Sequence, residues 1–248
     1  MSDHIVITLL KPYQKKGFFQ KLQRRKADAL YREGSFTHEF IWQDRRFVFS
    51  LSKRKMNDMW IFRSVANDVK AYLDQHPTIR SKKKLPVNVW NRKLMNFRGK
   101  ITATDVDHAY WRIAYQQGVI SHKTYTKGLT VQDKALRLAA LANMASSKEY
   151  RLIVAGKLTK DTVVIKYNPL THKVYNNIRF QCYAHMTEMV KLLGEDFICY
   201  KTDCIYYKDT EQNRKIVQDY LDKNELLWKQ LIEVKRPSYE EESSFTGE

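Results

Sequence analysis

The sequence has few cysteines, few glycines and no long apolar run, and each shortage argues against a class of protein. Its three cysteines, Cys182, Cys199 and Cys204, are odd in number and lack CxxC spacing, which argues against a disulfide framework and a zinc site. With only 8 glycines, the chain contains neither GxxxxGK[ST] nor GxGxxG. No stretch reaches the roughly 18 apolar residues of a membrane span, and no signal-peptide pattern is present. We therefore expect a cytoplasmic protein without a membrane partner.

Acidic residues are scarce in the first hundred positions, where 8 Asp and Glu stand against 23 Lys and Arg. The whole chain carries a net charge of +17, which favours a polyanionic partner such as nucleic acid. The aromatic residues Tyr13, Phe18 and Phe19 are interleaved with the basic ones. This pattern fits a solvated helix over a small core, or a surface that tracks phosphates while its rings stack on bases. The candidate DNA-binding residues are Lys15, Lys16, Arg24, Arg25, Lys82, Lys83, Lys84, Arg92 and Lys93.

Hydrophobic periodicity predicts an α+β fold in which short strands alternate with amphipathic helices. Strands are expected at 5–10, 100–106 and in two hairpins, 36–51 and 162–175. A strand, a tight turn and a second strand are expected over 197–209. Helices are predicted over 59–76, 109–121, 131–154, 176–196 and 210–236.

Two acids, Asp105 and Asp203, lie at the ends of predicted strands about a hundred residues apart. Carboxylates on adjacent strands can hold two Mg²⁺ ions roughly 3.5–4 Å apart, the arrangement that two-metal phosphoryl transfer requires. Asp203 also stands inside an apolar run, CYKTDCIYY, where a buried charge needs a cationic partner. From spacing alone, solvated acids in turns are the commoner explanation.

The surroundings of these two acids resemble motifs of the family-B DNA polymerases. DVDHAYW, residues 105–111, is similar to motif A, D-x-x-S-L-Y-P. YKTDCIYY, residues 200–207, is similar to motif C, Y-x-D-T-D-S, and the helix predicted before it resembles the helix that leads into that motif. The resemblance covers about residues 98–210.

The resemblance implies a palm-like antiparallel sheet with helices packed on one face and a short helical, fingers-like insertion. It implies that Asp105 and Asp203 are the catalytic metal ligands, with the backbone carbonyl of Val106 as a further ligand of Mg²⁺ or Mn²⁺. It also places Tyr110 where the family has the ring that excludes a 2′-hydroxyl. The implied activity is a minimal DNA polymerase or nucleotidyltransferase that uses deoxynucleoside triphosphates.

The sequence departs from the family in both motifs and most strongly in motif B, K-x-x-x-N-S-x-Y-G. Lys201 replaces the first Asp of motif C, and His108 and Trp111 replace the Ser and Pro of motif A. Asn143 fits the motif B Asn, but Ala139 then stands at the Lys that holds the triphosphate. Lys134 and Arg137 are the candidate substitutes, because either side chain can reach phosphate oxygens.

The expected regions are a basic flank (1–97), the palm and fingers core (98–210), a short C-terminal helical segment (211–236) and a disordered acidic tail (237–248). A proofreading domain is not expected, because the chain leaves no room for one beside the core. The small size suits a bacteriophage or mobile element, with host cytoplasm as the location and accessory replication proteins as further partners.

Alternative hypotheses remain open beside the polymerase. One is a catalytically inactive, polymerase-derived DNA-binding protein of a replication or packaging assembly, which Lys201 and the lost motif B Lys favour. Another is a metal-dependent nuclease of a different fold that uses the same two acids. The last is a basic scaffold that does not touch nucleic acid.

Overall fold

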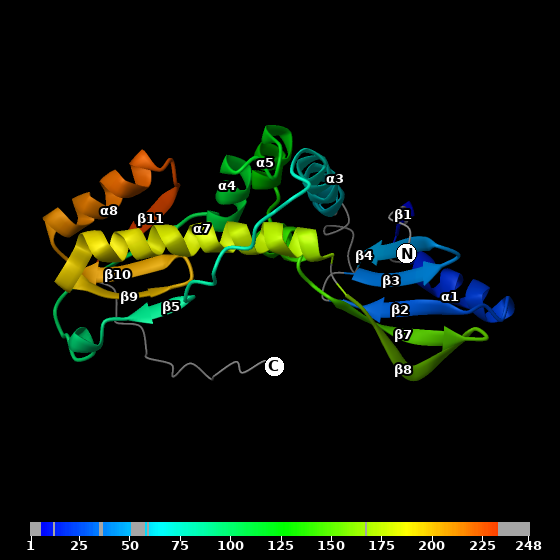
Figure 1. Cartoon of the computed structure of the whole chain (residues 1–248). Helices are drawn as coiled ribbons and strands as arrows, with labels where there is room; N and C mark the ends of the chain where they lie inside the picture. Colours follow the sequence, from blue (N-terminus) through cyan, green and yellow to red (C-terminus); the bar gives the residue numbers. More distant parts are fainter. Residues whose placement is uncertain are drawn as a thin grey trace. The chain divides into compact units, whose positions relative to one another are not determined.

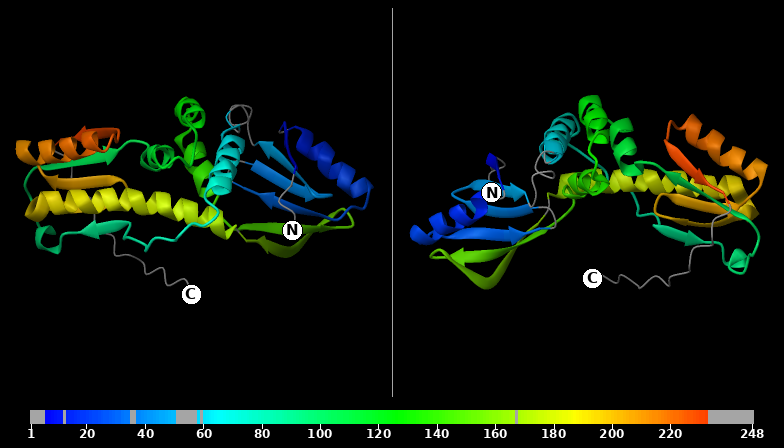
Figure 2. Two further views of the ribbon diagram at one scale, coloured as in Figure 1. Left: turned by 45° about the horizontal axis from the view of Figure 1, so that its top comes forward. Right: turned by 180° about the vertical axis from the view of Figure 1, so that it is seen from behind.

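The computed structural model describes residues 6–11, 13–34, 37–50, 58, 60–166 and 168–232, and these residues form an α+β fold. They divide into two units, each built from two separate stretches of chain (Figure 1, Figure 2). The first unit draws on residues 1–82 and 114–178, and the second on 83–113 and 179–248. The core expected over residues 98–210 thus contributes to both units. The acidic tail expected over residues 237–248 lies outside the described residues.

A six-stranded sheet forms the body of the first unit, and its strands in spatial order are β1 (Val6–Leu10), β4 (Arg45–Ser50), β3 (Thr37–Trp42), β2 (Ala29–Glu33), β7 (Lys148–Val154) and β8 (Lys157–Ile165). Neighbouring strands are antiparallel except β1 and β4, which are parallel. The predicted hairpin at 36–51 is confirmed by β3 and β4. Its two-residue loop, Gln43 and Asp44, has φ values of 49° and 55°, as a type I′ turn requires.

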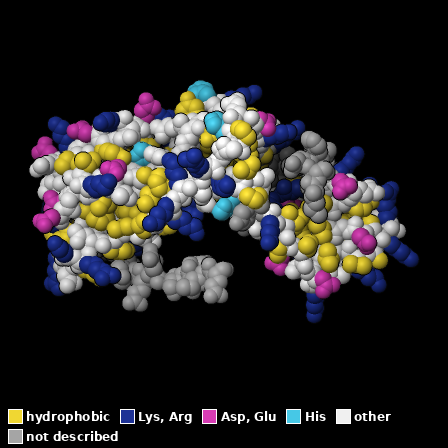
Figure 3. Space-filling model, in the orientation of Figure 1, with side chains coloured by type: hydrophobic (Ala, Val, Ile, Leu, Met, Phe, Trp, Pro, Cys, Tyr) yellow, Lys and Arg dark blue, Asp and Glu magenta, His cyan; other side chains and the backbone are white. Residues whose placement is uncertain are grey.

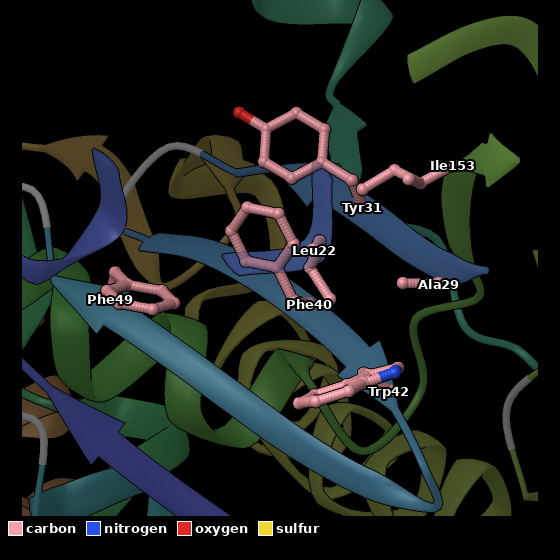
Figure 4. Close-up of a cluster of buried hydrophobic side chains, with 7 residues drawn as sticks. All are labelled: Leu22, Ala29, Tyr31, Phe40, Trp42, Phe49 and Ile153. Carbon is pink, nitrogen blue, oxygen red and sulfur yellow. The ribbon is translucent and has the colours of Figure 1, made fainter. Parts of the chain in front are cut away.

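Helix α1 (Gln14–Arg24) packs its apolar side on one face of this sheet, where seven buried side chains meet (Figure 4). The ring of Phe18 lies 4.5 Å from that of Phe47 and 5.2 Å from that of Phe40. Phe18 and Phe19 are therefore part of the core packing, whereas Tyr13 is 69% exposed. The buried residues of the cluster are Leu22, Ala29, Tyr31, Phe40, Trp42, Phe49 and Ile153.

Helices α3 (Trp60–Gln75), α5 (His122–Leu129) and α6 (Lys134–Ala142) also belong to the first unit. Helix α3 confirms the prediction over 59–76, and its buried residues Ile61, Val65 and Val69 follow the expected spacing. Ser121 caps α5 and also donates its hydroxyl to the Asp68 carboxylate of α3 at 2.9 Å. No helix within the described ranges is both long and apolar enough to cross a membrane.

A five-stranded antiparallel sheet forms the body of the second unit, in the order β11 (Trp228–Leu231), β6 (Ile101–Val106), β10 (Cys204–Lys208), β9 (Phe197–Lys201) and β5 (Asn88–Trp90). Strand β6 confirms the strand predicted at 100–106, and β9 and β10 confirm the strand, turn and strand predicted at 197–209. Helix α4 (Ala109–Gln116) follows β6, and a short 3-10 turn, η1 (Arg92–Leu94), follows β5.

Helix α8 (Glu211–Lys223) is tied to one face of the second sheet by polar side chains. Gln230 of β11 donates to the hydroxyl of Tyr207 at 2.8 Å and accepts from Gln218 of α8 at 3.2 Å. The Thr104 and Tyr207 hydroxyls lie 2.8 Å apart on this same face. Helix α7 (Pro169–Leu193) runs beside the same sheet in all views, and the boundary between the units, at 178 and 179, falls within it (Figure 2).

Three secondary-structure predictions are wrong. The hairpin expected at 162–175 does not form. Strand β8 pairs antiparallel with β7, which precedes it in the chain, and α7 already begins at Pro169. The helix expected over 131–154 ends at Ala142, and residues 148–154 form β7 instead. The helix expected over 210–236 ends at Lys223 and is followed by strand β11.

Candidate functional site

The two predicted acids are brought together at one end of the second sheet. Asp105 lies on β6 directly opposite Cys204, the first residue of β10, and Asp203 is the residue immediately before Cys204. The backbone N–H of Val106 donates to the carbonyl of Asp203 at 2.9 Å, which ties the two segments together beyond the strand pairing. Residues separated by about a hundred positions thus become neighbours through antiparallel pairing.

Asp203 is presented by a tight turn between β9 and β10. Lys201 and Cys204 are paired, so Thr202 and Asp203 form a two-residue hairpin loop. Thr202 has φ of 56°, in the left-handed region of the backbone. Such a conformation is uncommon for a β-branched residue, and the backbone N–H of Thr202 is held by the carbonyl of Val87 at 2.9 Å. The turn therefore fixes where Asp203 stands.

Both carboxylates act electrostatically on the cysteines around them. Burial raises the pKa of the Cys204 thiol to about 11, and the nearby charges of Asp105 and Asp203 add to that effect. Burial also raises the pKa of Cys182 on α7, with a further contribution from Asp203. These cysteines are therefore uncharged at neutral pH, and they place apolar surface beside the acids.

Tyr110 of α4 lies in the same unit and is fixed by a second tyrosine. Its hydroxyl lies 2.7 Å from that of Tyr183 on α7, and the two rings meet edge to face with centroids 6.5 Å apart. Burial, followed by this hydrogen bond, raises the pKa of Tyr110, so the phenol stays protonated. The ring is thereby held in one orientation.

Arg179 of α7 is a cation near this group that the sequence analysis did not single out. Its guanidinium lies 5.8 Å from the centroid of the Tyr183 ring, and its charge lowers the pKa values of Tyr110 and Cys182 against the larger effect of burial. The signal in the sequence was helical spacing, because Arg179, Cys182 and Tyr183 share one face of a helix.

Two lysines lie close to the acids in the strand register. Lys201, which stands where the family has an acid, is paired with Cys204 and holds its ammonium 5.4 Å from the ring centroid of Trp90. Lys229 of β11 is paired with Asp105 and places its Nζ 3.1 Å from the carboxylate of Asp107. The row of paired residues Lys229, Asp105, Cys204 and Lys201 therefore places one acid and an uncharged cysteine between two lysines across the sheet.

The residues proposed to replace motif B belong to the other unit. Lys134 begins α6 and is exposed, and Asn143 follows α6 and is exposed as well. Arg137 is only 5% exposed, and its guanidinium donates to the carbonyls of Gly128 at 3.1 Å and Val131 at 2.8 Å. These bonds give Arg137 a structural role at the end of α5, and its contact with nucleotide stays a prediction.

The predicted DNA-binding residues are distributed over both units. Lys16, Arg24 and Arg25 are exposed on or just after α1, whereas Lys15 is half-buried with its ammonium 3.1 Å from Nε2 of His38. Lys82, Lys83 and Lys84 are exposed before β5, and Arg92 and Lys93 are exposed on η1. Figure 3 shows lysine and arginine side chains over the visible face of each unit, with fewer acidic ones among them.

The donor set for a metal is small. Among the described residues, no group of three or more His, Cys, Asp and Glu side chains is placed to hold an ion. Asp105 and Asp203 supply two carboxylates, and carboxylate, carbonyl and phosphate oxygens are the ligands that Mg²⁺ accepts with few protein groups. The pair fits a site that a substrate phosphate would complete. Comparisons of this chain with protein-family models, with curated proteins and with solved structures found no match.

Proposed function

We propose that this protein is a minimal, family-B-like nucleotidyltransferase that extends a DNA primer from deoxynucleoside triphosphates. The observation that carries the proposal is the register that sets Asp105 opposite Cys204 and therefore beside Asp203. In the family that the motifs resemble, two such carboxylates on a palm-like sheet hold the metals, and helices cover the opposite face. The positions of Asp105 and Tyr110, which agree with motif A, and the helix, turn and strand around motif C support the same reading.

In the proposed reaction, each residue of the site would have a separate role. Asp105, Asp203 and the Val106 carbonyl would hold Mg²⁺ or Mn²⁺, which supplies charge neutralisation for the attacking and leaving oxygens. Tyr110, fixed by Tyr183, would lie under the sugar and leave no room for a 2′-hydroxyl. Arg179 would contact triphosphate oxygens, because a guanidinium binds phosphate in a bidentate manner.

Primer extension on a primed DNA template tests this proposal. Wild type should extend the primer with Mg²⁺ or Mn²⁺, and Asp203→Asn and Asp105→Asn should each reduce the rate by at least about a hundredfold, because each removes a metal-binding charge. Asp107→Asn is the matched control, since Asp107 lies two residues from Asp105 and its carboxylate forms an ion pair with Lys229. It should retain most of the activity. Equal activity in wild type and Asp203→Asn would contradict the proposal.

A second candidate is a polymerase-derived DNA-binding protein without catalysis. The observation that favours it is Lys201, whose place in the row beside Cys204 and Asp105 puts a cation where the family has an acid. A positive charge there would weaken cation binding by Coulomb repulsion. This candidate predicts salt-sensitive DNA binding by wild type and by Asp203→Asn, with no extension by either protein. Metal-dependent cutting of the DNA would instead support the nuclease hypothesis.

A further inference from the structure

The first unit contains a cluster of three cations around one buried acid that none of the sequence motifs includes. Glu39 of β3 is 4% exposed. Its Oε2 atom accepts from Arg46 of β4, through Nε at 3.0 Å and Nη2 at 2.5 Å, and from the Tyr150 hydroxyl of β7 at 2.9 Å. Its Oε1 atom lies 3.4 Å from Nη1 of Arg32 on β2 and 3.7 Å from Nζ of Lys148 on β7.

All five side chains lie on the face of the sheet that α1 does not cover. Glu39 is paired with Arg32 in the strand register, and Phe40, the next residue along β3, points to the opposite face and packs under α1. Strands β2, β3, β4 and β7 each supply a member, so the cluster is held by rigid elements. The side chains of Arg32, Arg46 and Lys148 are 30%, 20% and 11% exposed, so a part of each side chain reaches solvent.

One carboxylate requires one cation, and this carboxylate has three. The cluster therefore carries an excess of two positive charges within hydrogen-bonding reach of a single acid, and the cations repel one another. The repulsion is visible at Lys148, where burial first and the charge of Arg46 second lower the pKa to about 8, against the opposing effect of Glu39. A second anion would relieve that repulsion. Surplus charge kept at a cost in stability is typical of a functional site.

We infer that this face of the first sheet binds the phosphodiester backbone of a DNA strand, with Arg32, Arg46 and Lys148 contacting phosphate oxygens. Glu39 is a positioning residue that holds the two guanidinium groups in place. Arginine presents five donors in a rigid fork, so donors remain beyond those that Glu39 accepts. The inference goes beyond the proposed nucleotidyl transfer, because it depends on neither Asp105 nor Asp203.

Lys148→Met is the informative variant, since Glu39 keeps Arg46, Arg32 and Tyr150 as partners when Lys148 is lost. Binding of a fluorescent single-stranded oligothymidylate is measured by anisotropy as a function of salt, without metal or nucleotide. We expect binding about three- to tenfold weaker and a salt slope smaller by about 0.7, the values for one phosphate contact. We also expect a higher melting temperature, because a repelled, buried cation has been removed. Lys148→Arg should bind as wild type does.

Lys160→Met is the control, because it removes the same charge from an exposed position on neighbouring β8. It should change affinity by less than about twofold and leave the melting temperature unchanged. Unaltered binding by Lys148→Met, no binding by wild type, or a lower melting temperature for Lys148→Met would each overturn the inference. If binding is weakened in Lys148→Met but not in Lys160→Met, and wild type does not extend a primer, the inference stands and only the proposed nucleotidyl transfer is rejected.

Discussion

The negative charges of two acids in this protein, Glu39 and Asp203, are stabilised in different ways. Glu39 is almost fully buried and is held by protein cations, whereas Asp203 is partly exposed in a turn beside a second acid. A carboxylate that already has strong partners is suited to organising its neighbours. A pair of carboxylates at the end of a sheet is suited to attracting a cation from outside.

Replacing Glu39 tests how strongly the first unit depends on this acid. Glu39→Gln keeps the shape but leaves three cations without a counter-charge, so the free energy of unfolding should fall by about 3 kcal/mol near neutral pH. Glu149→Gln, an exposed acid beside Lys148, should change it by less than about 0.5 kcal/mol. Urea denaturation followed by circular dichroism measures both. Equal losses in the two variants would show that the cluster does not stabilise the unit.

The contribution of Glu39 to the free energy of unfolding depends on pH. Burial alone would raise the pKa of Glu39, but the charges of Arg46 and Lys148 outweigh it, so the pKa lies below its ordinary value. The stabilisation is therefore complete above the unfolded pKa, near 4.5, and is lost as the pH falls through the folded pKa. The difference in unfolding free energy between wild type and Glu39→Gln should accordingly shrink below about pH 4.

At the scale of elements, α8 supports the sheet that carries the candidate site. Leu221 of α8 is fully buried, so Leu221→Ala should reduce the free energy of unfolding by about 2–4 kcal/mol. Leu192 on α7 is 51% exposed and offers the same substitution without a cavity. Leu192→Ala should cost less than about 0.5 kcal/mol. A thermal melt of both variants checks the contrast, and similar melting temperatures would exclude a packing role for α8.

Elements with strong local signals could be predicted, and those that depend on distant partners could not. The 3.6-residue spacing of Ile61, Val65 and Val69 was sufficient for α3. Asn168 and Pro169 suggest a turn, but they begin α7, because the Asn168 side chain accepts from the N–H of Leu170 and proline suits the first helical position. Strand β11 is defined by its pairing with β6, which no local periodicity reveals.

In the candidate site, too, residues within short motifs could be predicted from the sequence, whereas others could not. Asp105, Asp203 and Tyr110 were accessible from short motifs, and the strand register explains why the two acids are neighbours. Arg179 escaped notice because a single arginine on a long helix carries no motif. The Glu39 cluster could not be predicted from the sequence, because its members come from four strands and only the strand register brings them together.

At the scale of the whole molecule, the dominant property is the excess of basic residues. With a net charge of +17, the proposed DNA binding should weaken at least about tenfold between 50 and 200 mM salt, through counterion release. Asp105→Asn and Asp203→Asn should not weaken it, because both remove negative charge. Anisotropy titrations at several salt concentrations measure this. Affinity that is independent of salt would argue against recognition of the phosphate backbone.

Because β6 is paired along both of its edges, it should tolerate no insertion or deletion of single residues during evolution. Because β10 and β11 flank it, gaining or losing one residue within 101–106 would turn Asp105 to the side of the sheet where Thr104 and Tyr207 now meet α8. A carboxylate would then enter a buried layer whose hydroxyl and amide groups already bond one another, and the acid pair would be lost at the same moment. Length variation in relatives of this chain should therefore be absent from this strand and collect in turns such as the one joining β7 to β8.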